Sequence, residues 1–216
     1  MKLPFFDGQR TTDYALSPTK IVGVGLNYRA HIAEMGRALP DEPVIFLKPP
    51  SALLSPGEPI VLPGGFENVH FEGELAFVVG RRARKVPERD ALGYVLGYTC
   101  LNDVTVRELQ QKDVQWARAK GFDTFAPVGP RIVAGLDPAN LELKTRVNGV
   151  EKQRSNTSDL IFGVARLVSF ISGVMTLEKG DLVTTGTPSG VGPLRPGDKV
   201  EIEIGGIGIL ANPVKD

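Results

Sequence analysis

The chain has 216 residues, enough for one domain with a sizeable core. Lys plus Arg and Asp plus Glu both number 25, so the formal net charge is zero, which argues against nucleic acid or an acidic membrane as a partner. The single Cys100 excludes an internal disulfide, and no apolar run approaches the length of a membrane span. We therefore expect a soluble, cytoplasmic protein.

The N-terminal part of the chain predicts a short lead-in over residues 1–20 and one domain over residues 21–216. An apolar strand is expected over residues 21–26. After it, Asn27 suits the N-cap of a helix and Gly36 suits its C-terminal stop, which predicts a helix of about two turns.

His31 and Glu34 lie three positions apart on this helix and share one face. A carboxylate beside an imidazole fixes its tautomer and raises its basicity, which suits a general base acting on water. The competing interpretation is an exposed pair without consequence, and the pattern alone favours it. The low apolar content of the helix and of the loop up to Pro43 is compatible with a mobile lid.

The next strand is expected over residues 44–48 and is ended by Pro49 and Pro50. Its last residue, Lys48, can be an anion contact or a solvated strand end. The solvated strand end is the interpretation that the sequence favours.

The strand expected over residues 69–80 carries two carboxylates, Glu72 and Glu74, on one face, which His70 shares. The apolar run that follows implies burial on both faces, where two like charges are unfavourable unless a cation lies between them. All-oxygen ligands suit a hard ion such as Mg²⁺, Ca²⁺ or Mn²⁺ rather than zinc. The alternative is a Glu-x-Glu pair on a solvated sheet face.

A third carboxylate, Asp103, follows the next apolar strand, over residues 91–101. If the two strands are close in one sheet, Asp103 completes a Glu-Glu-Asp site. It can instead cap the following helix, but Thr105 and Glu108 fit a capping box and leave Asp103 free.

A helix is expected from about residue 106 to 119, with Arg107, Gln110 and Gln111 on one face at its start. Arg107 can hold a carboxylate in its planar fork, and the alternative is a solvated face. Trp116 is interpreted as a core or interface residue. Lys120, in the loop that follows, can stabilise a developing oxyanion, although this signal alone is weak.

The C-terminal half predicts a strand over residues 141–147, a hairpin turn at Asn148-Gly149 and a helix capped by Ser158. A loop over residues 186–192 offers backbone N–H groups and hydroxyls that can cradle a carboxylate. Strands outnumber helices along the whole chain.

Six segments occur in one order from about residue 20 to the C-terminus, and together they carry a family resemblance. They are Gly25-Leu26-Asn27-Tyr28 with His31 and Glu34, Phe46-Leu47-Lys48-Pro49, His70-Phe71-Glu72-Gly73-Glu74-Leu75, Asn102-Asp103-Val104-Thr105 with Arg107 and Gln110, Lys120-Gly121-Phe122-Asp123, and Thr185 to Gly192. This set resembles the fumarylacetoacetate hydrolase superfamily, in its short single-domain acylpyruvase-like branch.

The resemblance implies a mixed α+β, mainly β fold around a rolled, barrel-like sheet with short flanking helices, with residues 21–216 as the catalytic domain of a homodimer. It also implies roles for nine residues. They are Glu72, Glu74 and Asp103 as ligands of Mg²⁺ or Mn²⁺, His31 and Glu34 as a water-activating pair on a lid, Lys120 at the oxyanion, and Arg107, Gln110 and Thr187 at the substrate.

The activity implied by the resemblance is metal-dependent hydrolysis of a C–C bond in acylpyruvates, such as fumarylpyruvate or acetylpyruvate, to pyruvate and a carboxylic acid. Decarboxylation or isomerisation of oxaloacetate or of 2-hydroxyhepta-2,4-diene-1,7-dioate-type dicarboxylates, in aromatic catabolism, is the alternative, because it uses the same enolate. A metal-binding protein without turnover is the alternative of another class. His31, Glu34 and Lys120 argue against it, because a structural metal site needs none of them.

Overall fold

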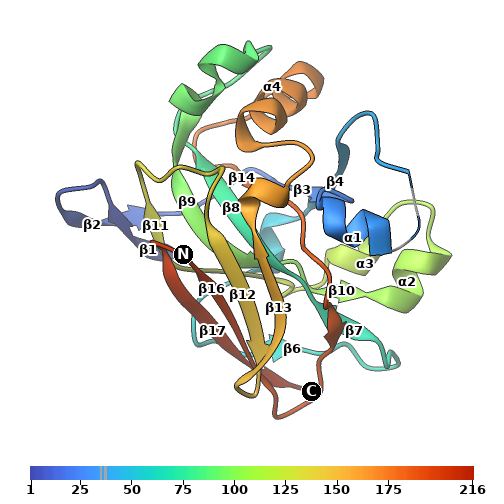
Figure 1. The fold of residues 1–216 in the computed structure, drawn as a ribbon. Coiled ribbons are helices and arrows are strands. Elements are labelled where there is room, and N and C mark those ends of the chain that lie inside the picture. The colour runs from blue at the N-terminus through green and yellow to red at the C-terminus, as the bar shows by residue number, and fades with distance from the viewer. Residues whose placement is uncertain (35, 37) are drawn as a thin grey trace.

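The computed structural model describes residues 1–34, 36 and 38–216, with the backbone alone at positions 31 and 34 (Figure 1). Strands dominate, so the predicted mixed α+β, mainly β fold is confirmed. Within the described residues the strands form a nine-stranded, a five-stranded and a three-stranded sheet. No helix among them is long and apolar enough to cross a membrane.

The nine-stranded sheet forms the centre of the fold. Its order is β2 (Thr11–Ala15), β1 (Lys2–Phe6), β11 (Ala126–Val133), β9 (Val95–Asn102), β8 (Gly73–Val79), β14 (Leu182–Thr184), β3 (Ile21–Gly25) and β4 (Val44–Lys48), with β5 (Leu53–Leu54) paired to β11. Residues 1–20 thus contribute β1 and the edge strand β2, and Leu3 of β1 is buried.

The five-stranded sheet packs against this one, and the three-stranded sheet lies beside the ends of β8 and β9. The first contains β13 (Val150–Asn156), β12 (Glu142–Val147), β16 (Lys199–Ile204), β17 (Gly208–Lys215) and β6 (Ile60–Val61), and the second contains β10 (Thr105–Val106), β7 (Val69–Phe71) and β15 (Gly192–Pro193). Asn148 and Gly149 have positive φ and join β12 to β13, as the predicted hairpin turn requires.

The helices are short and lie outside the sheets. They are α1 (Arg29–Glu34), α2 (Arg107–Lys112), α3 (Ala117–Lys120), α4 (Val164–Val174) and the 3₁₀ helices η1 (Pro50–Ala52), η2 (Glu88–Tyr94) and η3 (Thr157–Asp159). In Figure 1, α1, α2 and α3 gather at one side of the molecule, whereas α4 covers another.

The main core lies where the two large sheets and α4 meet. Leu75 and Phe77 of β8, Ile202 of β16 and Leu167 of α4 belong to one buried cluster. Burial of such a side chain contributes roughly 1.5–3 kcal/mol. All seven residues of β8 are buried, because β8 lies between β9 and β14 and is covered on both faces. The predicted burial of the carboxylate strand is therefore confirmed.

Three predictions about helices are wrong. The helix expected over residues 106–119 is divided into α2 and α3. The capping box does not form, because Thr105 belongs to β10 and Glu108 accepts the backbone N–H groups of Glu67 and Asn68. The helix expected after Ser158 begins only at Val164.

Asn27 is not an N-cap either. Its side chain hydrogen-bonds to Phe162 and Thr185, so it joins the start of the α1 segment to two loops more than a hundred residues away.

Candidate active site

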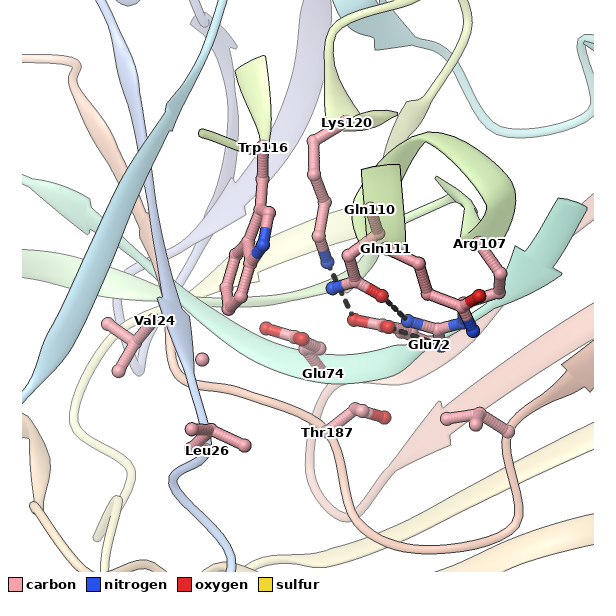
Figure 2. Close-up of a pocket in the computed structure, with 12 residues that line it drawn as sticks. Val24, Leu26, Glu72, Glu74, Arg107, Gln110, Gln111, Trp116, Lys120 and Thr187 are labelled. Carbon is pink, nitrogen blue, oxygen red and sulfur yellow. Dashed lines mark hydrogen bonds and ion pairs between the residues drawn. The ribbon is translucent and has the colours of Figure 1, made fainter. Parts of the chain in front are cut away.

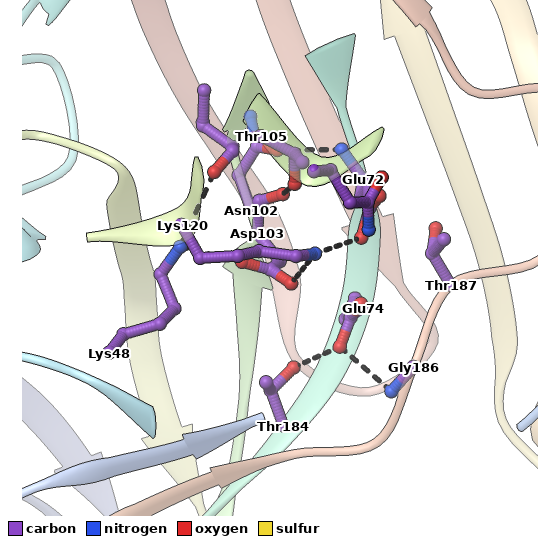
Figure 3. A network of polar contacts seen from close by, with 12 residues as sticks. Lys48, Glu72, Glu74, Asn102, Asp103, Thr105, Lys120, Thr184, Gly186 and Thr187 are labelled. Atoms are coloured by element: carbon purple, nitrogen blue, oxygen red, sulfur yellow. Dashed lines mark hydrogen bonds and ion pairs between the residues drawn. The ribbon is translucent and has the colours of Figure 1, made fainter. Parts of the chain in front are cut away.

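Three carboxylates meet at the end of β8. The antiparallel register pairs Gly73 of β8 with Asn102 of β9, so Asp103 lies beside Glu72, and its N–H donates to the Glu72 carbonyl at 2.9 Å. Glu74 is the second residue of β8. One oxygen from each of Glu72, Glu74 and Asp103 lies within 4.8 Å of the other two, and all three residues are buried (Figure 3).

Three cations surround two of these carboxylates. Lys120 Nζ, at the end of α3, lies 3.0 Å from Glu72 Oε2 and also contacts Asp103. Lys48 Nζ lies 2.6 Å from the other Asp103 oxygen, Oδ1. Arg107 Nη2 lies 2.5 Å from Glu72 Oε1. Burial alone would raise the pKa of Glu72, but the charges of Lys120 and Arg107 outweigh it and lower this pKa to about 2.

Glu74 has no cation at ion-pair distance among the described side chains. It accepts hydrogen bonds from the Thr184 hydroxyl and from the Gly186 N–H, the latter at 2.8 Å. Burial, followed by the negative charges of Asp103 and Glu72, raises the pKa of Glu74 well above its ordinary value. The ionised form of this carboxylate is therefore unfavourable, because no described side chain forms an ion pair with it.

The donor set fits a hard divalent cation. It offers carboxylate oxygens alone, which Mg²⁺ and Mn²⁺ prefer, and an added positive charge would compensate Glu74. The buried acidic triad is thus suited to a divalent metal.

A cavity of about 450 Å³ opens beside the triad (Figure 2). Its lining residues are Val24, Gly25, Leu26, Glu72, Glu74, Arg107, Gln110, Gln111, Trp116, Lys120, Thr187 and Val191. Gln110, Gln111 and Glu72 lie near Arg107 at one side of the view, and Trp116 lies with Val24 and Leu26 at the other side, with Lys120 and Glu74 between the two groups. The cavity therefore has a polar end and an apolar end.

Trp116 is half-buried and forms part of the cavity wall. Its indole packs edge-on against Phe46, with ring centroids 5.5 Å apart. Gly25 makes this position possible, because a Cβ at residue 25 would lie 2.9 Å from Trp116 Cζ3.

At the polar end, Arg107 is the first residue of α2, and its Nη1 donates to Gln110 Oε1 at 2.7 Å, one turn later. This bond holds the two side chains together at the cavity. Thr187 reaches the cavity from the loop after β14 and donates to the Gly73 carbonyl at 3.0 Å.

The structure brings most of the predicted site residues together. Glu72, Glu74, Arg107, Gln110, Lys120 and Thr187 line the cavity, and Asp103 lies behind them, in contact with Lys120. His31 and Glu34 are on α1, as predicted, but their side chains lie outside the described part of the chain.

Sequence reasoning missed two buried polar residues next to the site. Lys48, interpreted as solvated, is 1 % exposed and pairs with Asp103. Gln153 is also 1 % exposed and hydrogen-bonds to Gly73 and Thr187. Lys48 ends an apolar strand beside two prolines, and this pattern could have indicated its burial. No sequence pattern around Gln153 indicates that its side chain is buried.

Fold and site together define an enzyme pocket built around a buried carboxylate triad for a divalent metal. The model of the fumarylacetoacetate (FAA) hydrolase C-terminal family matches residues 20–215, so the chain belongs to this family of enzymes. The resemblance stated from the sequence is thereby confirmed.

Relatives in this family carry different activities. An oxaloacetate tautomerase, FAHD2, from Arabidopsis thaliana mitochondria is 47 % identical over 88 % of this chain and 87 % of its own. The crystal structure of a 5-carboxymethyl-2-hydroxymuconate delta-isomerase from Mycobacterium smegmatis is 49 % identical, with a TM-score of 0.89 over 95 % of this chain and 86 % of its own. Fumarylpyruvate hydrolase from Pseudomonas aeruginosa, in complex with Mn²⁺ and pyruvate, is 30 % identical, with a TM-score of 0.88 over 99 % of this chain and 96 % of its own.

Proposed function

We propose that the protein is a metal-dependent enzyme of small 2-oxo acids, and that it hydrolyses a C–C bond in acylpyruvates such as fumarylpyruvate or acetylpyruvate. The products are pyruvate and a carboxylic acid. The observation that carries the proposal is the buried triad of Glu72, Glu74 and Asp103, which lies at the cavity that Lys120 and Arg107 line.

In this proposal, Glu72, Glu74 and Asp103 hold Mg²⁺ or Mn²⁺, which supplies Lewis-acid chemistry for the oxygens of the 2-oxo acid. With all groups ionised, the charges of the three carboxylates are equal in number to those of Lys48, Lys120 and Arg107, which contact Glu72 and Asp103. A divalent ion adds two positive charges. A 2-oxo acid enolate, with its carboxylate and its enolate oxygen, carries two negative charges and restores neutrality in the buried site.

The remaining groups bind the substrate or stabilise its negative charge. The Arg107 guanidinium, held by Gln110, binds the substrate carboxylate in a planar fork. Thr187 donates its hydroxyl proton to the same end of the substrate. The Lys120 ammonium balances negative charge that develops on the substrate oxygen.

Hydrolysis also needs an activated water. His31, oriented by Glu34, takes a proton from water, and the resulting hydroxide adds to the carbonyl carbon of the acyl group. The C–C bond to the pyruvate part then breaks, and its electron pair goes to the pyruvate enolate. Protonation of the enolate carbon gives pyruvate.

A second candidate is chemistry that uses the enolate without hydrolysis: tautomerisation or decarboxylation of oxaloacetate, or isomerisation of a 2-hydroxyhepta-2,4-diene-1,7-dioate-type dicarboxylate. Sequence identity favours it, because the tautomerase and isomerase relatives are 47 % and 49 % identical and the fumarylpyruvate hydrolase is 30 % identical. These reactions need the triad, Arg107 and Lys120 but no activated water.

The test is turnover by protein stripped with EDTA and reloaded with Mg²⁺ or Mn²⁺. Acetylpyruvate, fumarylpyruvate, oxaloacetate and the dienoate are each supplied, and the products are identified by mass and absorbance. Metal-dependent release of pyruvate and the matching acid, lost in His31→Ala, supports the hydrolase. Turnover of oxaloacetate or the dienoate alone supports the second candidate, and metal binding without any turnover contradicts both.

We further propose that the protein acts as a homodimer, as the family resemblance implies. Light scattering after size-exclusion chromatography tests the assembly, and a mass of one chain contradicts it.

A further inference from the structure

Gln153 connects the five-stranded sheet to the cavity wall. It lies in β13 with its side chain buried, and its Oε1 accepts the Gly73 N–H at 3.0 Å. Its Nε2 donates to Thr187 Oγ1 at 2.8 Å and to the Pro188 carbonyl at 2.9 Å. Gly73 separates the two glutamates of the triad, so one amide contacts both the carboxylate strand and the cavity loop.

These partners determine which way the Gln153 amide faces. A backbone N–H at Gly73 requires an acceptor, and a carbonyl at Pro188 requires a donor. The opposite orientation would place two donors together at Gly73 and two acceptors together at Pro188. Nε2 is therefore the atom that faces Thr187.

This orientation controls the single proton of the Thr187 hydroxyl. One lone pair of Thr187 Oγ1 accepts from Gln153, so the hydroxyl proton cannot be donated to Gln153. It goes to the Gly73 carbonyl, at 3.0 Å, or to an acceptor in the cavity that Thr187 lines. An anionic oxygen is a stronger acceptor than a neutral carbonyl, so a bound carboxylate receives the proton.

The backbone around Gln153 keeps this arrangement in place. Gly190, in the same loop as Thr187, has a φ of +94°, and a Cβ at this position would lie 2.0 Å from the Lys152 carbonyl oxygen. A Cβ at Gly73 would lie 3.1 Å from Gln153 Oε1. The loop and the carboxylate strand thus contact β13 closely, and the Gln153 side chain has little space to adopt another rotamer.

We propose that Gln153 is a positioning residue that makes Thr187 a hydrogen-bond donor to the substrate carboxylate. Gln153 does not line the cavity and acts through Thr187 alone. This inference rests on the proposed function, because it assumes that a 2-oxo acid occupies the cavity.

The sharpest variant is Gln153→Glu, which reverses the bond to Thr187. Glutamate still accepts the Gly73 N–H, but its second oxygen accepts the Thr187 proton and withdraws it from the substrate. Gln153→Met, of similar length, removes both kinds of hydrogen bond and carries the test if the glutamate variant does not fold. Thr145→Val is the matched control, since Thr145 pairs with Gln153 across β12 and β13 and its buried hydroxyl has no partner among the described residues.

The measurement is calorimetric binding of pyruvate to protein loaded with Mn²⁺, with melting temperature and Mn²⁺ affinity recorded for each variant. Loss of one hydrogen bond to a charged group weakens binding about tenfold or more. We expect this loss in Gln153→Glu, Gln153→Met and Thr187→Val, with no further loss in the Gln153→Met and Thr187→Val double variant. Thr145→Val should bind pyruvate within about twofold of the wild-type protein.

Two results overturn the inference: pyruvate affinity of Gln153→Met within about twofold of wild type, or losses that add in the double variant, which would show that the residues act separately. Failure of the proposed function has a different signature. In that case the wild-type protein binds Mn²⁺ but neither binds pyruvate nor turns over any of the oxo acids, and the inference fails with it.

Discussion

Lys48 Nζ lies 2.6 Å from Asp103 Oδ1, and both side chains are buried. Burial lowers the pKa of Lys48, and the Asp103 charge opposes this effect. Lys120 contacts the other Asp103 oxygen, Oδ2. Lys48 therefore contacts one oxygen of Asp103, while Lys120 lies between the other oxygen and Glu72.

Replacing Lys48 by methionine leaves a buried carboxylate with one of its two cations. We expect the free energy of unfolding to fall by about 3 kcal/mol, because breaking a buried pair leaves a charge uncompensated. Urea denaturation of the metal-free protein measures this. Lys112→Met, at an exposed position, should change it by less than about 0.5 kcal/mol. A similar small change in Lys48→Met would show that Lys120 alone suffices.

Glu74→Gln is expected to stabilise the metal-free protein by about 1 kcal/mol at pH 7, since it removes a carboxyl group whose raised folded-state pKa costs stability above the unfolded-state pKa. The glutamine oxygen still accepts from the Thr184 hydroxyl and the Gly186 N–H. The same change should abolish the rise in melting temperature that Mg²⁺ or Mn²⁺ gives the wild-type protein.

Thermal unfolding with and without metal tests both expectations for Glu74. Glu67→Gln, which removes a charge from an exposed position, should leave the metal-dependent rise unchanged. An unaltered rise in Glu74→Gln would contradict the assignment of Glu74 as a ligand.

The strands and the triad could be predicted because their signals are local. Alternation and apolar runs located β8, β9 and β12, and the placement of Glu72 and Glu74 on one strand face follows from the two-residue period. The proximity of Asp103 required only that two successive strands pair, which neighbouring strands commonly do.

The errors arose where a distant partner decides the role of a residue. Lys48 looks like a strand end until Asp103, 55 residues later, is beside it. Thr105 and Glu108 match a capping box, but pairing of β10 with β7 takes Thr105 into a strand. Asn27 resembles an N-cap, yet its partners are Phe162 and Thr185. Propensity is a weak prior against such tertiary contacts.

Asp181 should contribute to the acid limit of stability. Its buried carboxylate accepts hydrogen bonds from Thr19 and from Glu178, and Lys20 Nζ lies 2.5 Å away. Burial alone would raise the pKa of Asp181, but Lys20 and the N–H and O–H donors outweigh it and hold the pKa below its ordinary value of 3.8. The resulting stability is fully present above the unfolded-state pKa and is lost as the pH falls through the lower, folded-state pKa.

Asp181→Asn should therefore destabilise the protein by about 3 kcal/mol at pH 7 and make its stability less dependent on pH below about 4. Urea midpoints from pH 7 down to pH 3 measure both effects. Asp13→Asn, at an exposed position on β2, should retain the steep acid loss of the wild-type protein. An equally steep loss in Asp181→Asn would place the responsible carboxylate elsewhere.

Gly25→Ala should narrow the apolar end of the cavity. The added Cβ would lie 2.9 Å from Trp116 Cζ3, so the indole must move, and Phe46 blocks movement away from the cavity. We expect kcat/KM for a bulky acylpyruvate to fall about tenfold, and that for a small 2-oxo acid to fall less. Equal losses for both would contradict the expectation that the acyl group occupies the apolar end of the cavity. Gly64→Ala, where a Cβ meets nothing within 4 Å, is the control.

Asn27 joins three segments, which are the turn before α1, the loop at Phe162 and the loop at Thr185. Its Nδ2 donates to the Thr185 carbonyl at 2.8 Å and to the Phe162 carbonyl at 3.1 Å, and its Oδ1 accepts the Phe162 N–H at 2.8 Å. It follows Gly25 and Leu26 of the cavity wall and precedes α1. Asn27→Ala removes all three bonds and leaves buried backbone groups unpaired, at a cost of about 2 kcal/mol.

Asn27→Ala is expected to loosen α1 locally and also to lower the stability of the whole fold. Amide hydrogen exchange should accelerate in α1 and around Phe162 by more than the global loss of stability predicts, and kcat/KM should fall because α1 is less often in place. Asn140→Ala, which removes a single exposed hydrogen bond to Asn156, should change neither. Uniform acceleration across β8 and β9 would instead mean that Asn27 supports the fold as a whole and does not anchor α1.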